Sequence, residues 1–407
     1  MDRSFPSTVP AVPCCSSDVA RMKADARGFA LWSLGFRPFY LLASAFAGAS
    51  ILLWICQYTG HLPAAYVRSP AWHGHEMLYG YTVAVMAGFL LTAVRNWTGL
   101  PTPAGRTLMA LAGLWIAGRV LVLTPFALTA AVVNAAFPIA IAVAIGIPLV
   151  RSRNRRNYFF IGLLVLLGAA VLAFHLSALA LLAWPERANL QAGLDVVLFV
   201  LAVMGGRVIP MFTNNGVPGV QATRRPWVEK FALGTVIALF ASDILPVPAW
   251  FVALLAFGAA VAHAVRLWLW QPWRTTRAPM VWVLHVAYAW IVIYLVLRGF
   301  AALDRVAGLF AVHALTIGAI GGMTIGMMTR TARGHTGRPL APDRYEVACY
   351  VLVALAALIR VFGGLWLPGI YLATVVLSGV CWSAAFALYA IRYWPVLTRS
   401  RLDGKPG

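Results

Sequence analysis

Charged side chains are scarce in this sequence, and acidic ones are the scarcest. Only 11% of the 407 residues are charged, with 12 Asp and Glu against 32 Lys and Arg. An average soluble domain has about 25% charged residues. This deficit, together with a hydrophobic share of 61%, excludes an ordinary soluble fold for most of the chain.

Several chemical motifs are also missing. The five cysteines form no CxxC pair, so neither a zinc ribbon nor a disulfide framework is supported. The absence of GxxxxGKS, HExxH and GxSxG excludes a P-loop, a zinc-peptidase helix of that type and a serine elbow. CxxCH is absent too, so any haem would be held without covalent bonds.

Long apolar runs dominate what is present. A spanning helix needs about 20 mostly apolar residues, and twelve segments meet this need. They predict an all-α, polytopic integral membrane protein with one membrane domain over 36–395. The polar residues 1–35 are expected to form a disordered cytoplasmic tail without a signal peptide, and 396–407 a cytoplasmic C-terminal tail. The predicted spans are 39–58, 77–95, 107–124, 127–150, 158–183, 192–213, 229–245, 248–271, 280–302, 306–330, 345–366 and 369–394.

The net charge of +20 is explained by membrane topology. Lys and Arg are concentrated in alternate loops, as the positive-inside rule requires. This pattern places both termini in the cytoplasm, and it makes the lipid bilayer, not a nucleic acid, the expected partner of the basic residues. Six basic residues fall on the outer side or in the outer half of a helix, namely Arg68, Arg119, Arg187, Arg298, Arg305 and Arg360.

Landmarks recur with a period of four helices, which predicts a three-fold internal repeat. Arginines that open helices three, seven and eleven are 119 residues apart in both intervals, and glycines in helices two, six and ten are 118 and 116 apart. The repeats would cover roughly 36–157, 158–277 and 278–395. The landmarks are Arg106, Arg225 and Arg344, and Gly88, Gly206 and Gly322.

Histidines gather at one depth of the predicted bundle. His73 and His75 enter helix two from the outer face, while His175 and His313 lie roughly 10–12 Å below that face at 1.5 Å per residue. His61 is in an outer loop nearby. Ionisable side chains are costly in a bilayer, so each is a functional candidate.

These four histidines are the predicted metal ligands. Neutral imidazole binds haem iron and copper, and we expect His75 and His313 to be the axial ligands of a haem. On a regular helix His73 and His75 are about 200° apart, so one of them precedes the helix or the two serve different centres. Hydrogen-bonded interfacial histidines are the alternative.

Two arginines in the outer halves of helices three and eleven extend this hypothesis. Arg119 and Arg360 each need an anionic partner, and haem propionates would be suitable bidentate ones. The alternatives are pairing with Asp195, Asp243 or Glu76, or snorkelling to the interface. Asp195 could instead carry protons.

A second polar set is expected at the cytoplasmic ends of helices two, six and ten. Basic residues there complement the helix dipole and anionic lipids, although an anion or cofactor-carboxylate site is an alternative. His263 and His285 form a weaker candidate ligand pair in the inner halves of helices eight and nine. The cytoplasmic set comprises Arg95, Asn96, Arg207, Asn214, Asn215, Arg330, Arg333, His335 and Arg338.

The motif set resembles the NnrS family. The resemblance implies a twelve-helix protein of the bacterial inner membrane that contains haem, expected to be b-type, and copper. It also implies a role in the nitric oxide response, denitrification and nitrosative stress. The matching stretches are "GFRPFYLLAS", "WHGHEMLYGYTVAVMAGFLLTAVRNWTG", "RSRNRRN", "GGRVIPMFTNN" and "HALTIGAIGGMTIGMMTRTARGHTGRPL".

The four-helix period also resembles the catalytic subunits of haem–copper oxidases and nitric oxide reductases, whose haem histidines are on helices two and ten. Helices six and seven of this chain contain no histidine, so the three-histidine copper site of those enzymes cannot be built. Copper ligands would come from His73, His175 or His61.

The leading hypothesis is therefore a haem- and copper-containing membrane protein that binds nitric oxide, or relieves its nitrosyl products, at an outer-side metal site. No catalytic residue and no electron donor is assigned. A secondary transporter and a non-catalytic haem or nitric oxide sensor are the alternatives.

Overall fold

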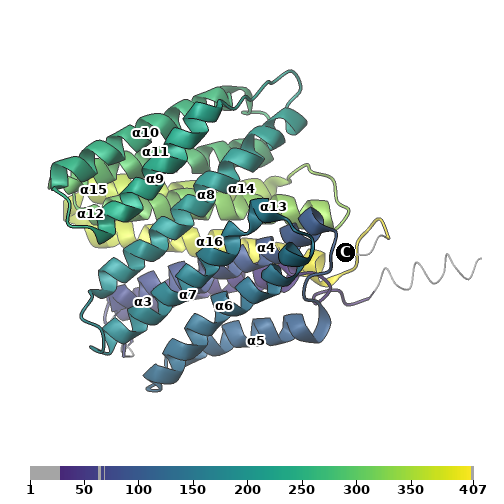
Figure 1. Cartoon of the computed structure of the whole chain (residues 1–407), viewed down its shortest axis with the longest axis horizontal. Coiled ribbons are helices and arrows are strands. Elements are labelled where there is room, and N and C mark those ends of the chain that lie inside the picture. Colours follow the sequence, from purple (N-terminus) through teal and green to yellow (C-terminus); the bar gives the residue numbers. More distant parts are fainter. Residues whose placement is uncertain (1–27, 63–65, 68, 405–407) are drawn as a thin grey trace, which may run out of the picture.

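A computed structural model describes residues 28–62, 66–67 and 69–404 (Figure 1). Most of the predicted N-terminal tail, residues 1–27, lies outside the described part, as do Cys14 and Cys15. Within the described part the chain is helical and has no β-strand, and one isolated bridge pairs Phe29 with Arg399. The predicted all-α class is confirmed.

The helices follow one another with short connections, and several are continued by a π-helical segment. In chain order they are α2 (Phe36–Tyr58), α3 (Ser69–His75), η1 (Glu76–Thr82), α4 (Val83–Thr98), α5 (Gly105–Leu121), α6 (Ala127–Arg151), η2 (Arg155–Asn157), α7 (Phe159–Ala178), α8 (Glu186–Gly216), α9 (Pro226–Ile244), α10 (Ala249–Leu269), η3 (Pro272–Arg274), α11 (Pro279–Ala302), α12 (Gly308–His313), η4 (Ala314–Gly321), α13 (Gly322–His335), α14 (Arg344–Leu358), η5 (Ile359–Gly363), α15 (Gly364–Trp366), η6 (Pro368–Ile370) and α16 (Tyr371–Thr398).

Local sequence explains several helix boundaries. α4 ends where Gly99 takes a left-handed φ of 68°, a conformation that glycine adopts without steric cost. α9 and α11 begin at Pro226 and Pro279, which fit the first turn because its N–H groups have no partner within the helix.

Ten segments of the described chain are long and apolar enough to cross a membrane, which indicates a multi-pass membrane protein. Ten of the twelve predicted spans correspond to these segments. The other two fall on α5, which has 17 residues, and on α9, which contains Glu229, Lys230 and Asp243. The ten segments are Phe36–Tyr58, Pro70–Thr98, Ala127–Arg151, Arg155–Ala178, Glu186–Gly216, Ala249–Arg274, Pro279–Ala302, Gly308–His335, Arg344–Trp366 and Pro368–Thr398.

The first and last helices close the bundle by packing on each other. α2 contacts α16 along its length, and small residues let the two backbones approach. Trp382 Nε1 donates to the Ala47 carbonyl oxygen at 3.2 Å, and Ser383 Oγ donates to that of Gly48 at 2.9 Å. Figure 1 shows the two helices, purple and yellow, side by side.

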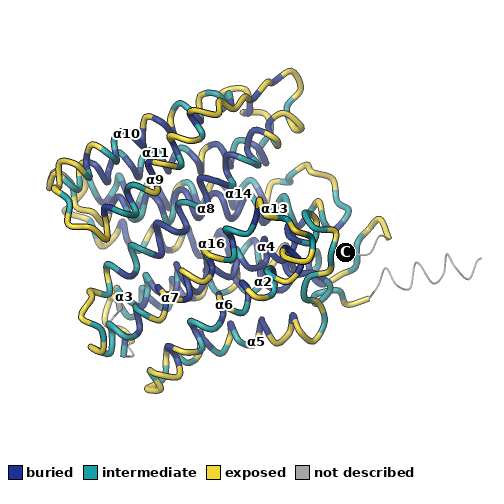
Figure 2. Tube along the Cα trace, in the orientation of Figure 1, coloured by how far each residue is buried: buried dark blue, intermediate teal, exposed yellow. Residues whose placement is uncertain are grey.

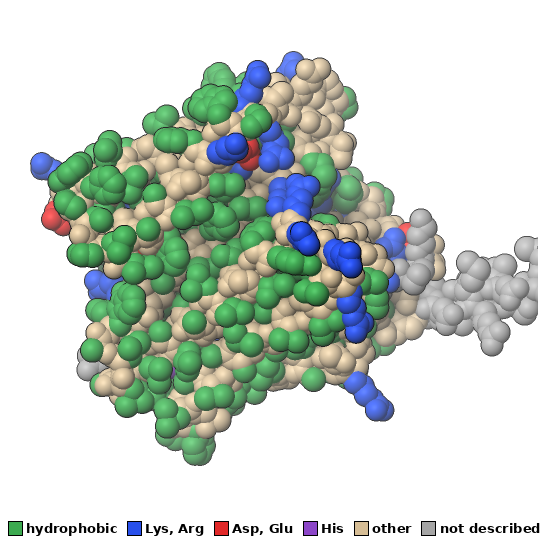
Figure 3. Space-filling model, in the orientation of Figure 1, with side chains coloured by type: hydrophobic (Ala, Val, Ile, Leu, Met, Phe, Trp, Pro, Cys, Tyr) green, Lys and Arg blue, Asp and Glu red, His purple; other side chains and the backbone are tan. Residues whose placement is uncertain are grey.

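Burial and charge follow the expected membrane pattern. Buried positions run along the inward sides of the helices, while exposed ones gather in loops and on peripheral helices such as α5 (Figure 2). Hydrophobic side chains cover most of the visible face in Figure 3, and most of its Lys and Arg side chains gather toward the end that carries the C-terminus. We call this end the basic end.

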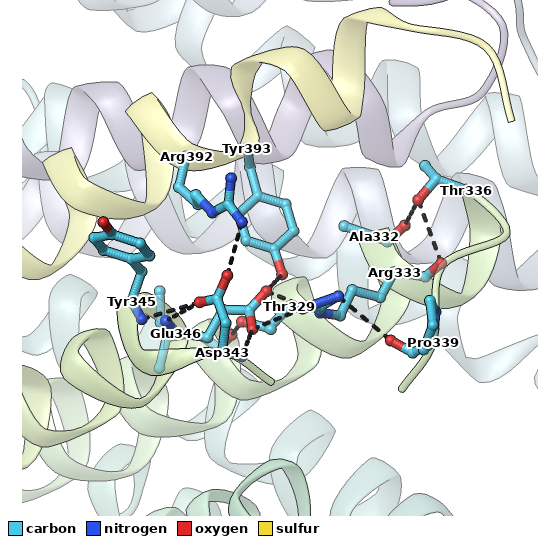
Figure 4. Close-up of polar contacts among 11 residues, drawn as sticks. Thr329, Ala332, Arg333, Thr336, Pro339, Asp343, Tyr345, Glu346, Arg392 and Tyr393 are labelled. Carbon is cyan, nitrogen blue, oxygen red and sulfur yellow. Dashed lines mark hydrogen bonds and ion pairs between the residues drawn. The ribbon is translucent and has the colours of Figure 1, made fainter. Parts of the chain in front are cut away.

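A cluster of ion pairs fastens α13, α14 and α16 together at the basic end (Figure 4). Arg333 binds both carboxylate oxygens of Glu346 at 2.9 and 3.1 Å, and the Tyr393 hydroxyl donates to the same carboxylate at 2.5 Å. Asp343 caps α14 by accepting from the backbone N–H groups of Tyr345 and Glu346. The basic side chain of Arg333 therefore has a structural partner.

Asp343 provides a test of this cluster. Partial burial acts to raise the pKa of its carboxyl, but hydrogen bonds from Arg392 and two backbone N–H groups hold that pKa below its usual 3.8. A lowered pKa gives stability that is present above pH 3.8 and is lost as the pH falls through the folded-state value.

We expect Asp343→Ala to cost about 1 kcal/mol of stability through the lost cap. Asp343→Asn, which keeps a capping side chain, should cost less and should remove the acid-dependent component. Thermal unfolding of the detergent-purified protein between about pH 3 and pH 7 measures both. Equal losses in the two variants would contradict the capping role.

Candidate functional site

A cavity of about 690 Å³ lies at the end of the bundle opposite the basic end. Segments from α2, α3, η1, α8, α9, α11, α12, η4, η5 and α16 contribute to its wall. Its volume falls within the roughly 300–1,000 Å³ of ligand and cofactor sites. The wall is mostly apolar, and its titratable side chains are His73, Tyr81, Arg187, Asp243, Tyr294, Arg298, His313 and Arg360.

Three π-helical segments flank this cavity. η1 begins directly after His75, η4 begins directly after His313, and η5 contains Arg360. A π turn adds a residue to the helical turn and re-aims the side chains beside it, and such turns are frequent at functional sites.

His73 and His313 face the same cavity from two different helices. Their ring centroids are 6.4 Å apart and their planes differ by 12°. Trp54 stacks on the His73 ring at 4.3 Å and restricts its rotation. His313 Nδ1 donates to the Leu309 carbonyl oxygen at 2.7 Å, which leaves the Nε2 lone pair available to a ligand.

Arg360 is a buried cation without an acidic partner among the described residues. Its side chain lies in the cavity wall and the residue is 6% exposed. Nη2 donates to the Tyr371 hydroxyl at 2.9 Å, and Nη1 is buried with no hydrogen-bond partner in the described part of the chain. A buried guanidinium is costly unless an anion compensates it, so this site favours an anionic ligand.

Arg298, by contrast, is fully compensated. It donates to Asp195 at 3.0 Å and to both oxygens of Asp243 at 2.7 Å, and it also donates to the Tyr294 hydroxyl at 2.7 Å. Gln191 donates to the same oxygen of Asp195 at 3.1 Å. This network forms the α8–α11 side of the cavity wall.

His75 points away from the cavity and meets His175. Their ring centroids are 4.7 Å apart, at 69°. His75 Nδ1 donates to a Glu76 carboxylate oxygen at 2.8 Å, and His175 Nδ1 lies 2.8 Å from the Tyr66 hydroxyl. Both rings are 0% exposed, and both Nε2 atoms are buried without a hydrogen-bond partner among the described residues. An unsatisfied buried polar group costs about 1–3 kcal/mol, so these two atoms require an explanation.

Arg119 belongs to this second cluster. It donates through Nη1 to the second Glu76 oxygen at 2.8 Å and through Nη2 to Asn134 Oδ1. Trp115 Nε1 donates to the Gly80 carbonyl oxygen at 2.9 Å and packs α5 against η1. The anion that Arg119 needs is thus supplied by Glu76.

The predicted ligands therefore form two pairs. The structure brings His73 to His313 and His75 to His175, whereas the predicted axial pair of His75 and His313 is divided between the clusters. The physical reason is helix geometry, because residues two apart on α3 point to opposite sides. This arrangement matches the alternative in which the two histidines of α3 serve different centres.

The other candidate histidines have separate surroundings. His61 is exposed, and its Nδ1 lies 2.8 Å from Thr59 Oγ1. His263 Nδ1 lies 2.7 Å from the Tyr288 hydroxyl, and His285 Nε2 lies 2.9 Å from Thr213 Oγ1. Within the described chain, no group of three or more His, Cys, Asp or Glu side chains is arranged to hold a metal ion.

Three residues of the polar set that was expected at the cytoplasmic ends line a smaller cavity of about 530 Å³ at the basic end, between α4, α8 and α13. Arg207 lies in its wall and donates to Asn157 Oδ1 at 2.8 Å. Asn96 and His335 lie in the same wall, whereas Arg330 stacks on the Phe212 ring at 3.9 Å.

The sequence did not indicate the roles of four residues that contact the cavity or the candidate histidines and Arg360. Trp54 and Tyr371 are aromatic residues in apolar helices, where nothing in the sequence separates a ligand contact from ordinary core packing. Tyr66 lies in a loop, and Arg298 was recognised only as an outward-lying arginine. Its pairing with both Asp195 and Asp243 could have been suspected from their common depth.

Comparison with known families identifies the chain. The family model described as NnrS protein matches residues 30–401, nearly the whole chain. The chain therefore belongs to the NnrS family, and this membership fits a role in the nitric oxide response. No curated protein gave a match.

Gly80 provides a test of the Arg119 cluster. A Cβ at this position would collide with Arg119 Nη1 and would lie 3.1 Å from Glu76 Oε2. We expect Gly80→Ala to displace Arg119 and destabilise the protein by about 1–3 kcal/mol. Gly162→Ala, where nothing lies within 4 Å of the added Cβ, should be neutral or stabilise by up to about 1 kcal/mol. Thermal unfolding in detergent compares the two, and equal midpoints would contradict tight packing at Gly80.

Proposed function

We propose that this NnrS-family protein binds haem in the 690 Å³ cavity and takes up nitric oxide there as part of the nitric oxide response. The observation that carries the proposal is the unpartnered Nη1 of Arg360 beside two cavity-facing histidines. Haem is an apolar disc with two carboxylates and a central iron. The apolar side chains of the wall would contact the disc, Arg360 would bind a carboxylate, and the two histidines would bind the iron.

Under this proposal His73 and His313 hold the iron, and Arg360 binds a propionate. With metal–nitrogen bonds of about 2 Å, two imidazoles whose centroids are about 6 Å apart could share one ion, and the separation of 6.4 Å supports this pairing. Haem iron, when bound, would supply the site for nitric oxide, which would take the place of one of the two histidines. The protein holds the rings through Trp54 and Leu309 and surrounds the site with apolar side chains.

The proposal changes the expected ligand set in two places. His73 replaces His75 as the partner of His313, because His75 faces the opposite side of α3. Arg360 keeps its expected role, while Arg119 is assigned to the cluster with Glu76.

We also propose the topology that the charges favour. Both termini lie in the cytoplasm and the protein crosses the bacterial inner membrane twelve times, with α5 and α9 as the two less apolar spans. The position of most basic side chains at one end supports this orientation. The cavity would then lie toward the outer face, which nitric oxide, a small neutral molecule, reaches through the bilayer.

Histidine substitutions test the ligand assignment. We expect the purified protein to contain iron and to show a Soret band. His73→Ala and His313→Ala should each shift that band or remove it, because each would remove a side chain that holds the iron. His61→Ala, an exposed loop variant, serves as the control and should leave the spectrum unchanged. Iron-free, colourless wild-type protein would refute the proposal and leave a transport path as the use of the cavity.

Arg360 provides an independent test. Arg360→Gln should weaken haem binding by about 10- to 100-fold, since hydrogen bonds to charged groups contribute about 1.5–3 kcal/mol. Arg187→Gln is the matched control, because Arg187 lines the same cavity but is exposed. Haem titration of haem-depleted protein in detergent measures the affinities. Equal affinities for Arg360→Gln and wild type would contradict a propionate contact.

A further inference from the structure

We propose that the 530 Å³ cavity at the basic end binds a phosphate group, carried by an anionic phospholipid or free in solution. This site is separate from the proposed haem cavity, so the inference goes beyond the haem proposal and does not depend on it. Membrane topology by itself accounts for basic residues in the loops at this end. The proposal rests on features of the cavity wall that topology does not require.

The first feature is the position of Arg207. It lies within α8, nine residues before that helix ends at Gly216, and not in a loop. Nη1 donates to Asn157 Oδ1 at 2.8 Å, which is the one hydrogen bond of this side chain among the described residues. The Phe159 ring centroid lies 5.4 Å from the guanidinium carbon. Nε and Nη2 form the opposite edge of the guanidinium and remain available, and such an edge binds two phosphate oxygens through parallel N–H groups.

A chain of amide groups fixes this arginine in the wall. Asn157 is 5% exposed and donates through Nδ2 to Asn154 Oδ1 at 3.0 Å. Asn154 Nδ2 in turn donates to the Trp97 carbonyl oxygen at 3.2 Å, near the end of α4. Asn157 Oδ1 is thereby held in place to accept the hydrogen bond from Arg207. A guanidinium that is already ordered loses less side-chain entropy when it binds a ligand.

The second feature is the charge of the wall, which is positive. Arg156 and Arg207 line the cavity, and no acidic side chain of the described residues does so. The charged side chains that act on Arg207 are Arg156 and Arg224, both cations. Of these three arginines, only Arg224 has an acidic partner in the described part of the chain, namely Glu229 at 3.2 Å. An anion that enters the cavity is therefore attracted without having to displace an internal carboxylate.

The third feature is the depth of the apolar part of the wall. α4 and α13 run toward the basic end, and on each helix an apolar lining residue precedes a polar one. Phe89 precedes Asn96 by seven residues and Met327 precedes His335 by eight, which places the polar groups about 10–12 Å nearer the basic end. Basic pockets between helices on the cytoplasmic side are typical sites for lipid headgroups. This gradient favours a phospholipid, with its phosphate at Arg207 and an acyl chain against the apolar side chains.

Native mass spectrometry of the full-length protein in detergent tests the lipid source. Phosphatidylglycerol is the probe, and phosphatidylcholine, whose headgroup has no net charge, is the comparison. We expect wild type to retain phosphatidylglycerol preferentially. Arg207→Gln should bind it about 10- to 100-fold more weakly, because a charge-assisted hydrogen bond is lost.

Two further variants make this result specific. Arg156 is exposed, so Arg156→Gln should fold normally and should also weaken phosphatidylglycerol binding, although less than Arg207→Gln. Arg277→Gln is the matched control, because it removes the same charge from an exposed arginine that does not line the cavity. It should bind phosphatidylglycerol as tightly as wild type.

Inorganic phosphate tests the other source, in phosphatidylcholine nanodiscs at constant ionic strength. A higher unfolding temperature with phosphate, seen in wild type and absent from Arg207→Gln, would assign the site to free phosphate. Preferential binding of phosphatidylglycerol without that rise would assign the site to the lipid, and either result supports the proposal.

The proposal is overturned if neither probe separates wild type from Arg207→Gln and Arg156→Gln. It is also overturned if Arg277→Gln loses phosphatidylglycerol binding to the same extent as Arg207→Gln, since the retained lipid would then follow only the total charge. The Soret band reads haem content independently, so failure of this site is distinguishable from failure of the haem site.

Discussion

A guanidinium buried in an apolar helical bundle needs a counter-charge at the place where it lies, and the internal structure of this protein depends on that constraint. Acidic residues are few, and most of those within the described helices are used for this purpose. Most of the resulting pairs join helices that are close in sequence, whereas Arg298 joins α11 to the earlier α8 and α9. The pairs are Arg119 with Glu76, Arg266 with Glu229, Arg298 with Asp195 and Asp243, and Arg333 with Glu346.

Arg360 departs from this pattern. Its hydrogen bond is to a neutral tyrosine, and one of its nitrogens is buried without a partner among the described residues. Arg37, the other buried arginine without an acidic partner among the described residues, donates to two backbone carbonyl oxygens and also leaves two nitrogens without a partner. Arg360 differs from it because its side chain lies in the wall of a cavity, where a ligand could supply the missing charge. The position of Arg360 in the wall that also holds His73 and His313 gives the cavity its proposed haem site.

α3 separates two kinds of histidine environment. On the cavity side, His73 is accessible and held by stacking on Trp54. On the opposite side, His75 is fully buried, bound to Glu76 and packed against His175. Two side chains separated by one residue thus lie in different surroundings.

Much of the fold could be predicted from the sequence. The length of each apolar segment and the uneven distribution of Lys and Arg among the loops can be seen in the sequence itself. Ten of the predicted spans match helices able to cross a membrane, whereas short α5 and charged α9 lie at the margin of that pattern. Depth along each helix also grouped His73, His175 and His313 at one end.

The pairing of these histidines could not be predicted in the same way, because it depends on which side of a helix each residue occupies. The π-helical segments after His75 and His313 alter the direction in which neighbouring side chains point, and no residue pattern in the sequence predicts these segments. The partner of Arg119 was open for a related reason, since three acidic residues lay at suitable depth. Only the packing of α5 on η1 selects Glu76.

The most direct test of the central claim is a cryo-electron microscopy map of the purified protein in detergent or nanodiscs. The account predicts porphyrin density inside the cavity, bonded to His73 and His313, with a propionate at Arg360. A map with an empty cavity, or with haem bound by His75 and His175, would contradict it.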